Sequence, residues 1–215
     1  MNQQIRKLRS DYSRMELNES EIAKDPVFQF ELWMKEALAA NVSEPHAMTL
    51  STVSVDGKPS SRIVLLRGFS AQGFVFYTNY NSKKGMDIAQ NPYASLNFFW
   101  PQIERQVRVE GRLEKVSSET SEKYFNSRPR ESKIGAWVSE QSQVIKSREV
   151  LENKFAELSA KYPAEKVPCP PFWGGYLLKP SVIEFWQGRP NRLHDRILFT
   201  LSDDEISWNL QRLAP

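Results

Sequence analysis

Residues 47–69 read AMTLSTVSVDGKPSSRIVLLRGF, two apolar-rich runs on either side of Asp56 and Gly57. An Asp-Gly pair between two such runs is a signature of a tight β-hairpin. Further strand-like runs follow at residues 73–80 (GFVFYTNY), 94–100 (ASLNFFW) and 105–116 (RQVRVEGRLEKV). The last two indicate a second antiparallel pair, so meandering strands dominate this half of the chain.

The second half returns to strands after a helical middle. Residues 172–179 (FWGGYLLK), 181–188 (SVIEFWQG) and 192–202 (RLHDRILFTLS) read as three strands, and the tail from residue 205 offers a fourth. Helices are predicted over residues 25–42 with Asp25 as N-cap, from Ser82 to just before Pro92, and over 118–162 with a break at Pro129. The last helical part is amphipathic, and Ser147 is its predicted cap. Strands and helices in separate runs predict an α+β fold around an antiparallel barrel.

Composition predicts one globular domain. The chain has 215 residues, of which 40% are apolar and 26% charged, and its net charge of +3 is too small to argue for nucleic acid. We expect residues 1–24 to form a mobile arm and residues 25–215 to form the single domain. No apolar run reaches the roughly 18 residues of a membrane span. The first 20 residues lack an apolar signal core, which predicts a cytoplasmic location.

Several familiar chemistries lack their sequence signatures. There is no P-loop, no Rossmann glycine pattern and no nucleophile elbow. His46 and His194 are too few for a histidine metal site, and the single Cys169 reads as an ordinary loop residue. Metal and phosphate-loop sites are therefore not predicted.

Cationic side chains stand in unusual settings instead. Arg62 and Arg67 bracket four aliphatic residues, and on a regular strand their odd separation places them on opposite faces, either reaching solvent or serving two anions. Lys83 and Lys84 open a helix after Ser82, where backbone amides favour phosphate. Tyr124, Arg128 and Ser132 surround Pro129 and could cradle a second phosphate, although an ordinary helix end has the same composition. A solvated surface explains each motif alone, but together they favour ligands that each carry a phosphate.

Residues 184–196 (EFWQGRPNRLHDR) add a charged face. If residues 192–196 form a strand, Arg192, His194 and Arg196 point the same way, and Leu193 and Asp195 point the other. Two arginines and an imidazole on one face repel one another unless an anion lies against them. Alternation likewise places Gln106 and Arg108 on one face of the run from residue 105, which also fits the wet side of a sheet.

These motifs resemble the pyridoxine (pyridoxamine) 5′-phosphate oxidase family. RIVLLR, FYTNYNSKKG, RQVRVEG, YFNSRPRESKIGAWVSEQS, FWGGY, EFWQG, NRLHDR and the terminal RLAP occur in the family's order from about residue 45 onwards. The resemblance implies a split β-barrel homodimer that binds FMN at the subunit interface. It implies oxidation of pyridoxine 5′-phosphate or pyridoxamine 5′-phosphate to pyridoxal 5′-phosphate, with hydride transfer to the flavin and release of hydrogen peroxide from dioxygen.

The resemblance also implies roles for individual residues. The FMN contacts it implies are Arg62, Ile63, Val64, Leu65, Leu66, Arg67, Tyr77, Thr78, Lys83, Lys84, Gln106, Gln141, Ser142, Trp186 and Arg196. The implied substrate contacts are Arg9, Tyr12, Arg67, Tyr124, Arg128, Ser132, Arg192, Leu193 and His194, with Arg192 and His194 over the reacting ring. Two positions depart from the family pattern, Arg67 for lysine and Lys83 for arginine, and both keep the charge.

Three other functions compete with this interpretation. An FMN reductase or haem-handling split barrel would lack the substrate motifs SRPRES and NRLHDR. A non-catalytic pyridoxal phosphate carrier would bind the same ligand without consuming oxygen. A nucleic-acid module is disfavoured by the low net charge and the absence of a basic aromatic stripe. The sequence leaves open the preference between alcohol and amine substrates.

Overall fold

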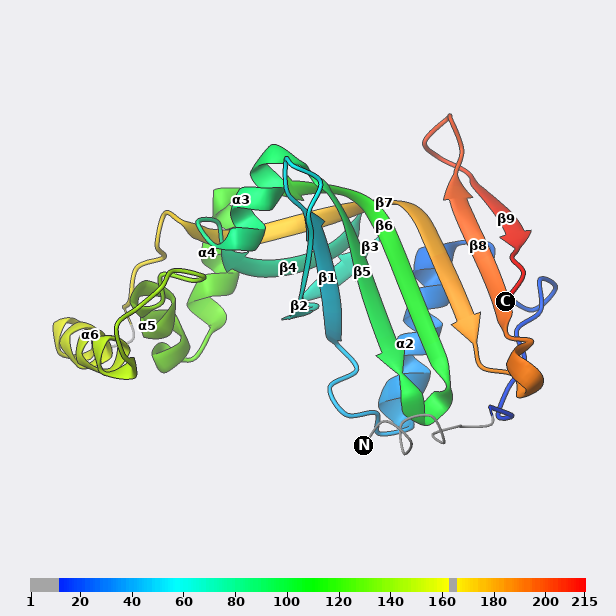
Figure 1. Cartoon of the computed structure of the whole chain (residues 1–215), viewed down its shortest axis with the longest axis horizontal. Helices are drawn as coiled ribbons and strands as arrows, with labels where there is room; N and C mark the ends of the chain where they lie inside the picture. The colour runs from blue at the N-terminus through cyan, green and yellow to red at the C-terminus, as the bar shows by residue number, and fades with distance from the viewer. Residues whose placement is uncertain (1–11, 163–165) are drawn as a thin grey trace. The chain divides into compact units, whose positions relative to one another are not determined.

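A computed structural model of the chain describes residues 12–162 and 166–215, and it is an α+β fold built on an antiparallel sheet, as predicted. The sheet strands pair in the order β2-β1-β5-β6-β7-β4-β3, and β8 pairs with β7 and β9 (Figure 1). Their bounds are β1 Ala47–Val53, β2 Pro59–Leu65, β3 Gly68–Ser70, β4 Gly73–Asn79, β5 Tyr93–Trp100, β6 Arg105–Lys115, β7 Trp173–Gln187, β8 Asp195–Leu201 and β9 Trp208–Arg212. The helices are α2 Pro26–Ala39, α3 Lys83–Gln90, α4 Ser118–Ser127, α5 Arg130–Val138 and α6 Arg148–Lys161.

Two compact units divide these elements. The first contains residues up to Thr49 with Ser95–Glu110 and Pro180–Pro215, and the second contains Leu50–Ala94 and Gly111–Lys179. Four strands are divided between the two units, with one end in each unit: β1, β5, β6 and β7. The single-domain organisation and the mobile arm predicted from the sequence stay predictions.

Aromatic packing forms the core of the first unit. From α2, the Phe30 ring lies 5.0 Å from Phe98 of β5, and the Trp33 ring meets Phe185 of β7 edge-on at 5.1 Å. Phe185 in turn meets Phe199 of β8 at 5.8 Å. The exposed fraction of each of these side chains is 3% or less, so α2 is fixed to the sheet by its apolar face.

The turn of the predicted hairpin lies in the second unit. Gly57 has a φ of 78°, and its N–H donates to the Ser54 carbonyl, which closes the turn between β1 and β2. The hairpin prediction is confirmed.

The core of this unit lies at the pairing of β4 with β7. Residues 74–79 of β4 pair antiparallel with residues 173–178 of β7, where Phe74, Phe76 and Leu178 are fully buried.

Helix α3 begins where the sequence predicts. Ser82 is its N-cap and accepts a hydrogen bond from the Gly85 amide at 3.3 Å. A Cβ atom on Gly85 would lie 2.0 Å from the Tyr80 carbonyl oxygen, so no larger residue fits without moving the backbone. The first turn of α3 is therefore packed directly against the end of β4.

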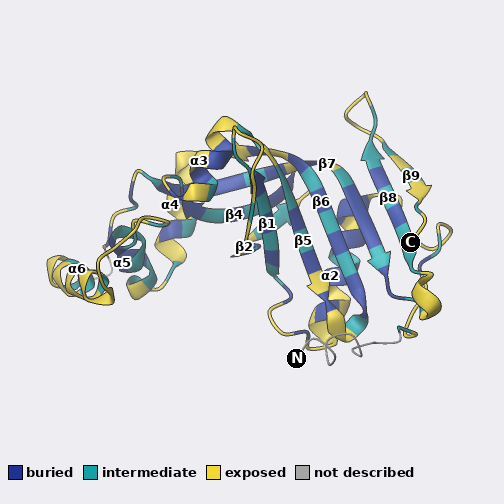
Figure 2. Ribbon diagram, viewed as in Figure 1, coloured by how far each residue is buried: buried dark blue, intermediate teal, exposed yellow. Residues whose placement is uncertain are grey.

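The helical middle breaks at Pro129 as predicted, and α6 begins directly after Ser147, the predicted cap position; residues 139–147 before it are not helical. Ile134, Val138 and Val167 form a small core, against which Leu151, Phe155 and Leu158 of α6 pack. Figure 2 shows mostly exposed residues along the rest of α6. Ser147 occupies the N-cap position, but its side chain makes no capping hydrogen bond. Among the described residues, no helix has the length and apolar character that crossing a membrane requires.

Three strand assignments from the sequence need correction. The run from residue 60 to 69 is not one strand, because β2 ends at Leu65 and β3 begins at Gly68. The runs on either side of Pro180 are one strand, β7. Pro180 lies between the residues paired with β4, which end at Leu178, and those paired with β8, which begin at Val182, so its missing N–H interrupts neither ladder.

The third correction concerns residues 192–194. Strand β8 begins only at Asp195, and Arg192 closes a short 3₁₀ turn in which Asn191 and Arg192 have φ angles of 59° and 62°. Arg192, His194 and Arg196 therefore do not share one strand face. A left-handed backbone at two successive residues cannot be part of a strand.

We expect Asp25→Ala to lower the free energy of unfolding by about 1 kcal/mol, because the Asp25 carboxylate accepts the first free amides of α2, from Val27 at 2.7 Å and Phe28 at 2.9 Å. Chemical denaturation monitored by circular dichroism measures the change. Asp25→Asn is the matched control, since an amide oxygen can cap in the same way. Equal losses from both substitutions would contradict the capping role.

Candidate functional site

A cavity of about 460 Å³ in the second unit is lined by four cationic side chains and, within the described chain, by no carboxylate. The cations come from β2, the segment after it, α3 and the end of α4. The lining residues are Arg62, Ile63, Val64, Leu65, Arg67, Tyr77, Thr78, Lys84, Tyr124, Arg128, Gln141, Ser142 and Trp173. Four positive charges around one hollow repel one another, so the cavity suits an anionic ligand.

Neutral oxygen atoms hold the Arg62 guanidinium in place. Its Nη1 donates to the Leu50 carbonyl at 3.2 Å and to Thr52 Oγ1 at 2.8 Å, and its Nη2 donates to Ser60 Oγ at 2.9 Å. Burial lowers the pKa of Arg62, and the nearby Asp87 charge opposes that effect. The guanidinium is thus oriented by hydrogen bonds while its direct partners leave its charge uncompensated.

Lys84 is held in the same manner. Its ammonium donates to Gln141 Oε1 at 3.0 Å and to Thr78 Oγ1 at 3.3 Å. Burial lowers the pKa of Lys84, and the positive charge of Arg62 lowers it further. A bound anion would reverse both effects, because it stabilises the charged form of each side chain.

The loop after α5 completes this wall. The Asn79 side chain donates to the Ser139 carbonyl at 3.3 Å, and the Lys83 amide donates to Ser142 Oγ at 3.2 Å. Ser142 has a left-handed φ of 72°. These contacts keep Gln141 and Ser142 beside the start of α3.

An aromatic stack forms the other wall of the cavity. The rings of Tyr77 and Tyr124 lie 3.9 Å apart and nearly parallel, and Trp173 lies parallel to Tyr77 at 5.4 Å. The Arg128 guanidinium lies 4.8 Å from the Trp173 ring centre. Its Nη1 is buried and has no hydrogen-bond partner among the described residues, and burial lowers the pKa of the group. A buried donor without an acceptor points to a ligand atom that supplies one.

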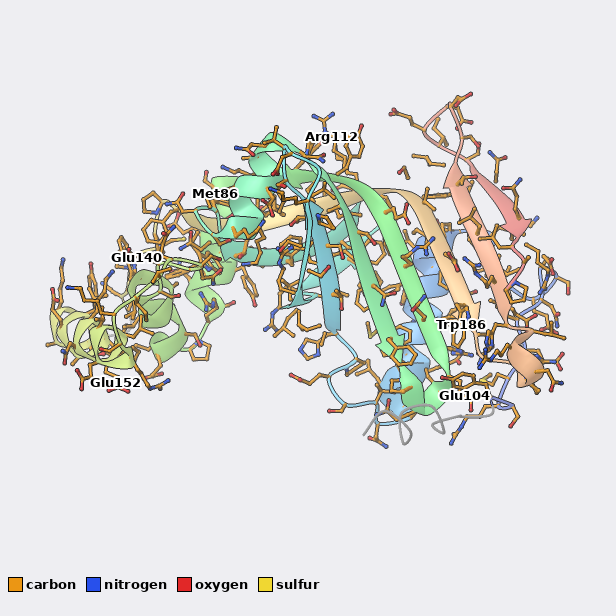
Figure 3. The ribbon with its side chains drawn as sticks, viewed as in Figure 1. Met86, Glu104, Arg112, Glu140, Glu152 and Trp186 are labelled. Carbon is orange, nitrogen blue, oxygen red and sulfur yellow. The ribbon has the colours of Figure 1, made fainter. Side chains whose placement is uncertain are left out.

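A second group of predicted site residues lies in the first unit. Trp186, labelled in Figure 3, lies 4.7 Å from the His194 ring centre, and the Tyr12 ring meets both edge-on at 5.6 and 5.8 Å. His194 Nδ1 accepts a hydrogen bond from the Arg189 amide at 3.1 Å. A ring that accepts at Nδ1 is neutral and carries its proton on Nε2, which leaves a donor for a ligand.

The anion that faces Arg196 belongs to this chain. Arg196 Nε lies 2.7 Å from Glu184 Oε1, and Arg108 Nη2 lies 2.8 Å from the other oxygen of the same carboxylate. Glu184 is 2% exposed, so this charge is fully enclosed. The repulsion argument for residues 192–196 therefore fails at Arg196, and only Arg192, which is exposed and forms none of the ion pairs found in the described chain, keeps an uncompensated charge.

Comparison with known proteins shows the family. The model of the pyridoxamine 5′-phosphate oxidase family matches residues 34–162, and that of the pyridoxine 5′-phosphate oxidase C-terminal dimerisation region matches residues 173–215. The chain belongs to the pyridoxamine 5′-phosphate oxidase family. Named pyridoxine/pyridoxamine 5′-phosphate oxidases from Gloeothece citriformis and Burkholderia vietnamiensis are 55% and 56% identical to it, over 100% and 97% of both chains.

Solved structures agree on the fold. PhzG from Burkholderia lata, crystallised with tetrahydrophenazine-1-carboxylic acid, has a TM-score of 0.88 and 28% identity over 94% of this chain and 99% of its own. An FMN-binding protein related to pyridoxamine 5′-phosphate oxidase, from Nostoc punctiforme, has a TM-score of 0.69 and 21% identity over 86% and 97%. The fold is the FMN-binding split barrel, and family membership makes the protein a flavin-dependent oxidoreductase.

The structure brings together most residues that the family resemblance had singled out in the second unit, and it leaves others outside the cavity. Leu66, Lys83 and Ser132 are not among the lining residues. In the first unit lie Tyr12, Gln106, Trp186, Arg192, Leu193, His194 and Arg196. Arg9 lies outside the described residues. The opposite-face prediction for Arg62 and Arg67 is wrong, because both line one cavity once the strand ends at Leu65.

Three residues near the cavity were missed from the sequence. Trp173 reads as an ordinary strand aromatic, and Thr52 as an ordinary strand threonine. Asp87 carried a usable signal, because it stands four residues after Lys83 on the same helix face. Only the fold shows that these side chains meet the predicted cations.

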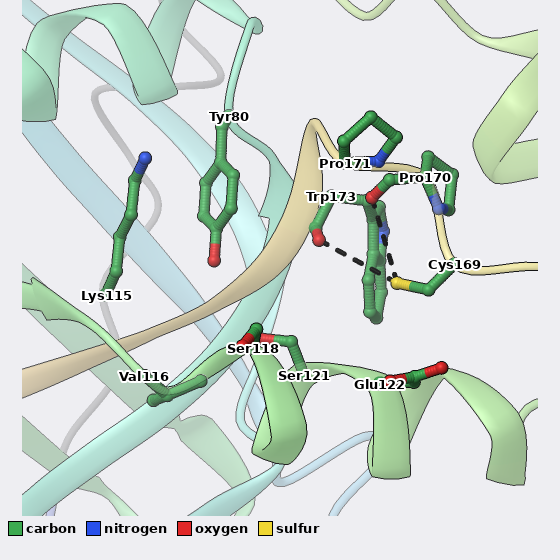
Figure 4. A pocket seen from close by; sticks show the side chains of 10 residues that line it. All are labelled: Tyr80, Lys115, Val116, Ser118, Ser121, Glu122, Cys169, Pro170, Pro171 and Trp173. Atoms are coloured by element: carbon green, nitrogen blue, oxygen red, sulfur yellow. Dashed lines mark hydrogen bonds between the residues drawn. The ribbon is translucent and has the colours of Figure 1, made fainter.

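A second cavity of about 380 Å³ in this unit shares Trp173 with the first (Figure 4). Cys169 lines it, and its thiol makes only long contacts to the Pro170 and Trp173 carbonyls. Burial raises the pKa of this thiol, so it stays protonated at neutral pH. Lys115 lies over the Tyr80 ring at 4.2 Å, and Glu122 supplies a negative charge, so this cavity lacks the uniform sign of the first.

We expect the His194 ring to titrate below the ordinary pKa of 6.5, because burial and then the charge of Arg192 lower its pKa, against an opposing effect of Asp195. Because the folded pKa lies below the unfolded one, the resulting stability is present above about pH 6.5 and is lost as pH falls. Arg192→Ala should move the pKa of His194 partway back to 6.5.

NMR titration of the imidazole protons measures this change. The chain has two histidines, so His46→Gln assigns the signals and serves as the control. A His194 titration that Arg192→Ala leaves unchanged would contradict the predicted electrostatic coupling.

Proposed function

We propose that this protein is an FMN-dependent oxidase that converts pyridoxine 5′-phosphate and pyridoxamine 5′-phosphate to pyridoxal 5′-phosphate. The alcohol and dioxygen give the aldehyde and hydrogen peroxide, and the amine also consumes one water and releases ammonium. The observation that carries the proposal is the cavity whose described lining holds four cations and no carboxylate, in a chain of this family. A cofactor and a substrate that each bear a phosphate account for that excess of charge.

The residues present fit a phosphorylated flavin. Arg62 and Lys84 carry charges that their neutral partners do not compensate, and the side of the cavity near them also offers Thr78, Gln141 and Ser142. These residues would hold FMN, with the backbone of residues 63–66 alongside. FMN, when bound, supplies the two-electron acceptor that dioxygen reoxidises.

The substrate phosphate would meet the other cations. Arg128 has an unpartnered Nη1 and lies beside Tyr124, and Arg67 lines the same cavity. Ser132, in the first turn of α5 and outside the cavity lining, is the fourth member that the family resemblance implies for this proposed cradle. A planar guanidinium matches a phosphate with two parallel hydrogen bonds, which would orient the substrate as well as bind it.

A second copy of the chain would complete the site. Gln106, Trp186 and Arg196 for the cofactor, and Arg192 with His194 for the substrate ring, lie in the first unit, and residues 173–215 match a dimerisation region. We therefore propose a homodimer in which the neutral His194 ring donates from Nε2 to the substrate and Arg192 covers it. The segment from Tyr12, which already touches Trp186 and His194, would exclude water from the ring.

Oxygen consumption by the purified protein tests the proposal. With FMN bound, both phosphorylated substrates should drive oxygen uptake and equimolar aldehyde formation, whereas pyridoxamine without phosphate should be a poor substrate. Binding of pyridoxal phosphate without turnover would instead identify a carrier. Activity on a reduced phenazine carboxylic acid, but not on either phosphate ester, would favour a reaction related to that of the PhzG complex.

We expect Arg128→Ala to raise KM for pyridoxamine 5′-phosphate by at least about tenfold, and to lower kcat less, because loss of a charged hydrogen bond costs roughly 1.5–3 kcal/mol. Steady-state oxygen uptake separates the two constants. Arg148→Ala is the matched control, since that arginine is exposed on α6 and pairs with Glu152. An unchanged KM would show that the phosphate binds elsewhere.

Arg192→Ala and His194→Ala should retain FMN and lose kcat/KM, with Arg192→Ala the more severe, because both side chains are proposed to position the substrate rather than the cofactor. Flavin absorbance per chain and kcat/KM are measured on the same samples. Loss of FMN from either variant at unchanged thermal stability would contradict this division of roles.

A further inference from the structure

Two adjacent lysines open α3, and their ammonium groups have different partners. Lys83 Nζ donates to both carboxylate oxygens of Asp87, at 3.2 and 3.0 Å. Lys84 Nζ donates to the neutral oxygens of Gln141 and Thr78 and lines the cationic cavity, whereas Lys83 does not. The sequence presents the two residues as equivalent, but only one has its charge neutralised.

Asp87 is an ionised carboxylate inside the fold. It is 5% exposed, and Thr52 Oγ1 donates to its Oδ2 at 2.9 Å. Burial alone would raise the pKa of Asp87, but the hydrogen bonds from Lys83 and Thr52, with the charges of Lys83 and Arg62, lower it below its ordinary value of 3.8. Asp87 is therefore charged at neutral pH, and its closest cation is the half-exposed ammonium of Lys83.

The same carboxylate fixes Arg62 through Thr52. The Thr52 hydroxyl has one proton, and because it donates that proton to Asp87, its lone pairs are free to accept Arg62 Nη1 at 2.8 Å. Asp87 thus determines the direction of a hydroxyl that orients one cation of the cavity. It also neutralises the charge of a second cation, Lys83, in an ion pair.

We infer that Asp87 is a positioning residue that decides which lysine of α3 meets an anion in the cavity: it holds Lys83 in an ion pair and leaves Lys84 as the anion-facing lysine. The inference rests on the proposed function, since the anion it concerns is the phosphate of FMN. Lys83 then acts as the counter-ion of Asp87 and not as a phosphate ligand. The positive charge of Lys83 would then stabilise the wall of the cavity by pairing with Asp87.

Flavin dissociation from the full-length holoprotein tests the inference. Recovery of flavin fluorescence on dilution gives the Kd, and riboflavin serves as the probe without phosphate. Lys84→Met should raise the Kd for FMN at least about tenfold, the effect of losing one charged hydrogen bond, and leave that for riboflavin unchanged. Lys83→Met should change the FMN value less than about twofold, like the control Lys58→Met, whose lysine pairs with Asp56 in the β1–β2 turn.

Asp87→Asn supplies the complementary measurement, because the amide oxygen can still accept from Thr52 while Lys83 loses its anionic partner. FMN should then bind more tightly by about two- to fivefold, a gain typical of one added partly exposed charge, and a further Lys83→Met should remove that gain. Thermal unfolding checks each variant. If Asp87→Asn does not fold, the comparison of Lys83→Met with Lys84→Met decides alone.

The outcomes distinguish a failure of this inference from a failure of the proposed function on which it rests. Equal weakening of FMN binding by Lys83→Met and Lys84→Met overturns the inference and leaves the flavin assignment in place. An Asp87→Asn gain that survives Lys83→Met overturns it as well. A native protein that binds no FMN contradicts the proposed function itself.

Discussion

Hydrogen bonds donated to neutral oxygen atoms hold positive charges in place without neutralising them, and the cavity depends on this constraint. Arg62 is bound by a carbonyl and two hydroxyls, and Lys84 by an amide and two hydroxyls. Arg128 lies on an indole ring. Carboxylates in these places would bind the cations more strongly, but they would also cancel the potential that attracts an anion. The folded protein therefore holds cations that repel one another near a common cavity, and their hydrogen bonds and the stacking on Trp173 offset that repulsion.

Arginines of the first unit show the opposite arrangement. Arg108 and Arg196 share the buried Glu184, Arg105 pairs with Glu36, and Arg212 pairs with Glu19 and Asp195. These pairs connect β6, β8 and β9 with α2 and the segment before it. Arg192 differs from them, because it lies on a left-handed turn and forms no ion pair with any residue that the structure describes. A carboxylate partner thus marks Arg105 and Arg212 as structural, whereas Arg196 is proposed to meet the cofactor although it is paired with Glu184.

Asp87 lies between these two arrangements. It belongs to the cavity unit, yet it neutralises Lys83 as a structural carboxylate would. Through Thr52 it also orients Arg62, so one buried charge both removes a cation from the ligand and fixes another for it. Replacing the carboxylate by an amide at this position would release Lys83, while the amide oxygen could still accept the Thr52 hydroxyl.

Local sequence determined the elements of this protein. The Asp56–Gly57 turn, the Asp25 and Ser82 caps and the break at Pro129 act within a few residues, so their physics is visible in the sequence. The cationic motifs and the family they resemble also named most lining residues of the cavity. Arguments from strand alternation failed at Arg67 and at Arg192, because alternation holds only while the strand continues.

Tertiary structure alone decided where strands end and which charges are compensated. The passage of β7 through Pro180 follows from how β7 pairs with two distant strands, β4 on one side of the proline and β8 on the other. Glu184 meets Arg108 across 76 positions of the chain, and Thr52 meets Asp87 across 35. The composition gives the number of charges. A charge is available to a ligand only when the fold keeps opposite charges away from it, and this separation depends on distances between residues far apart in the sequence.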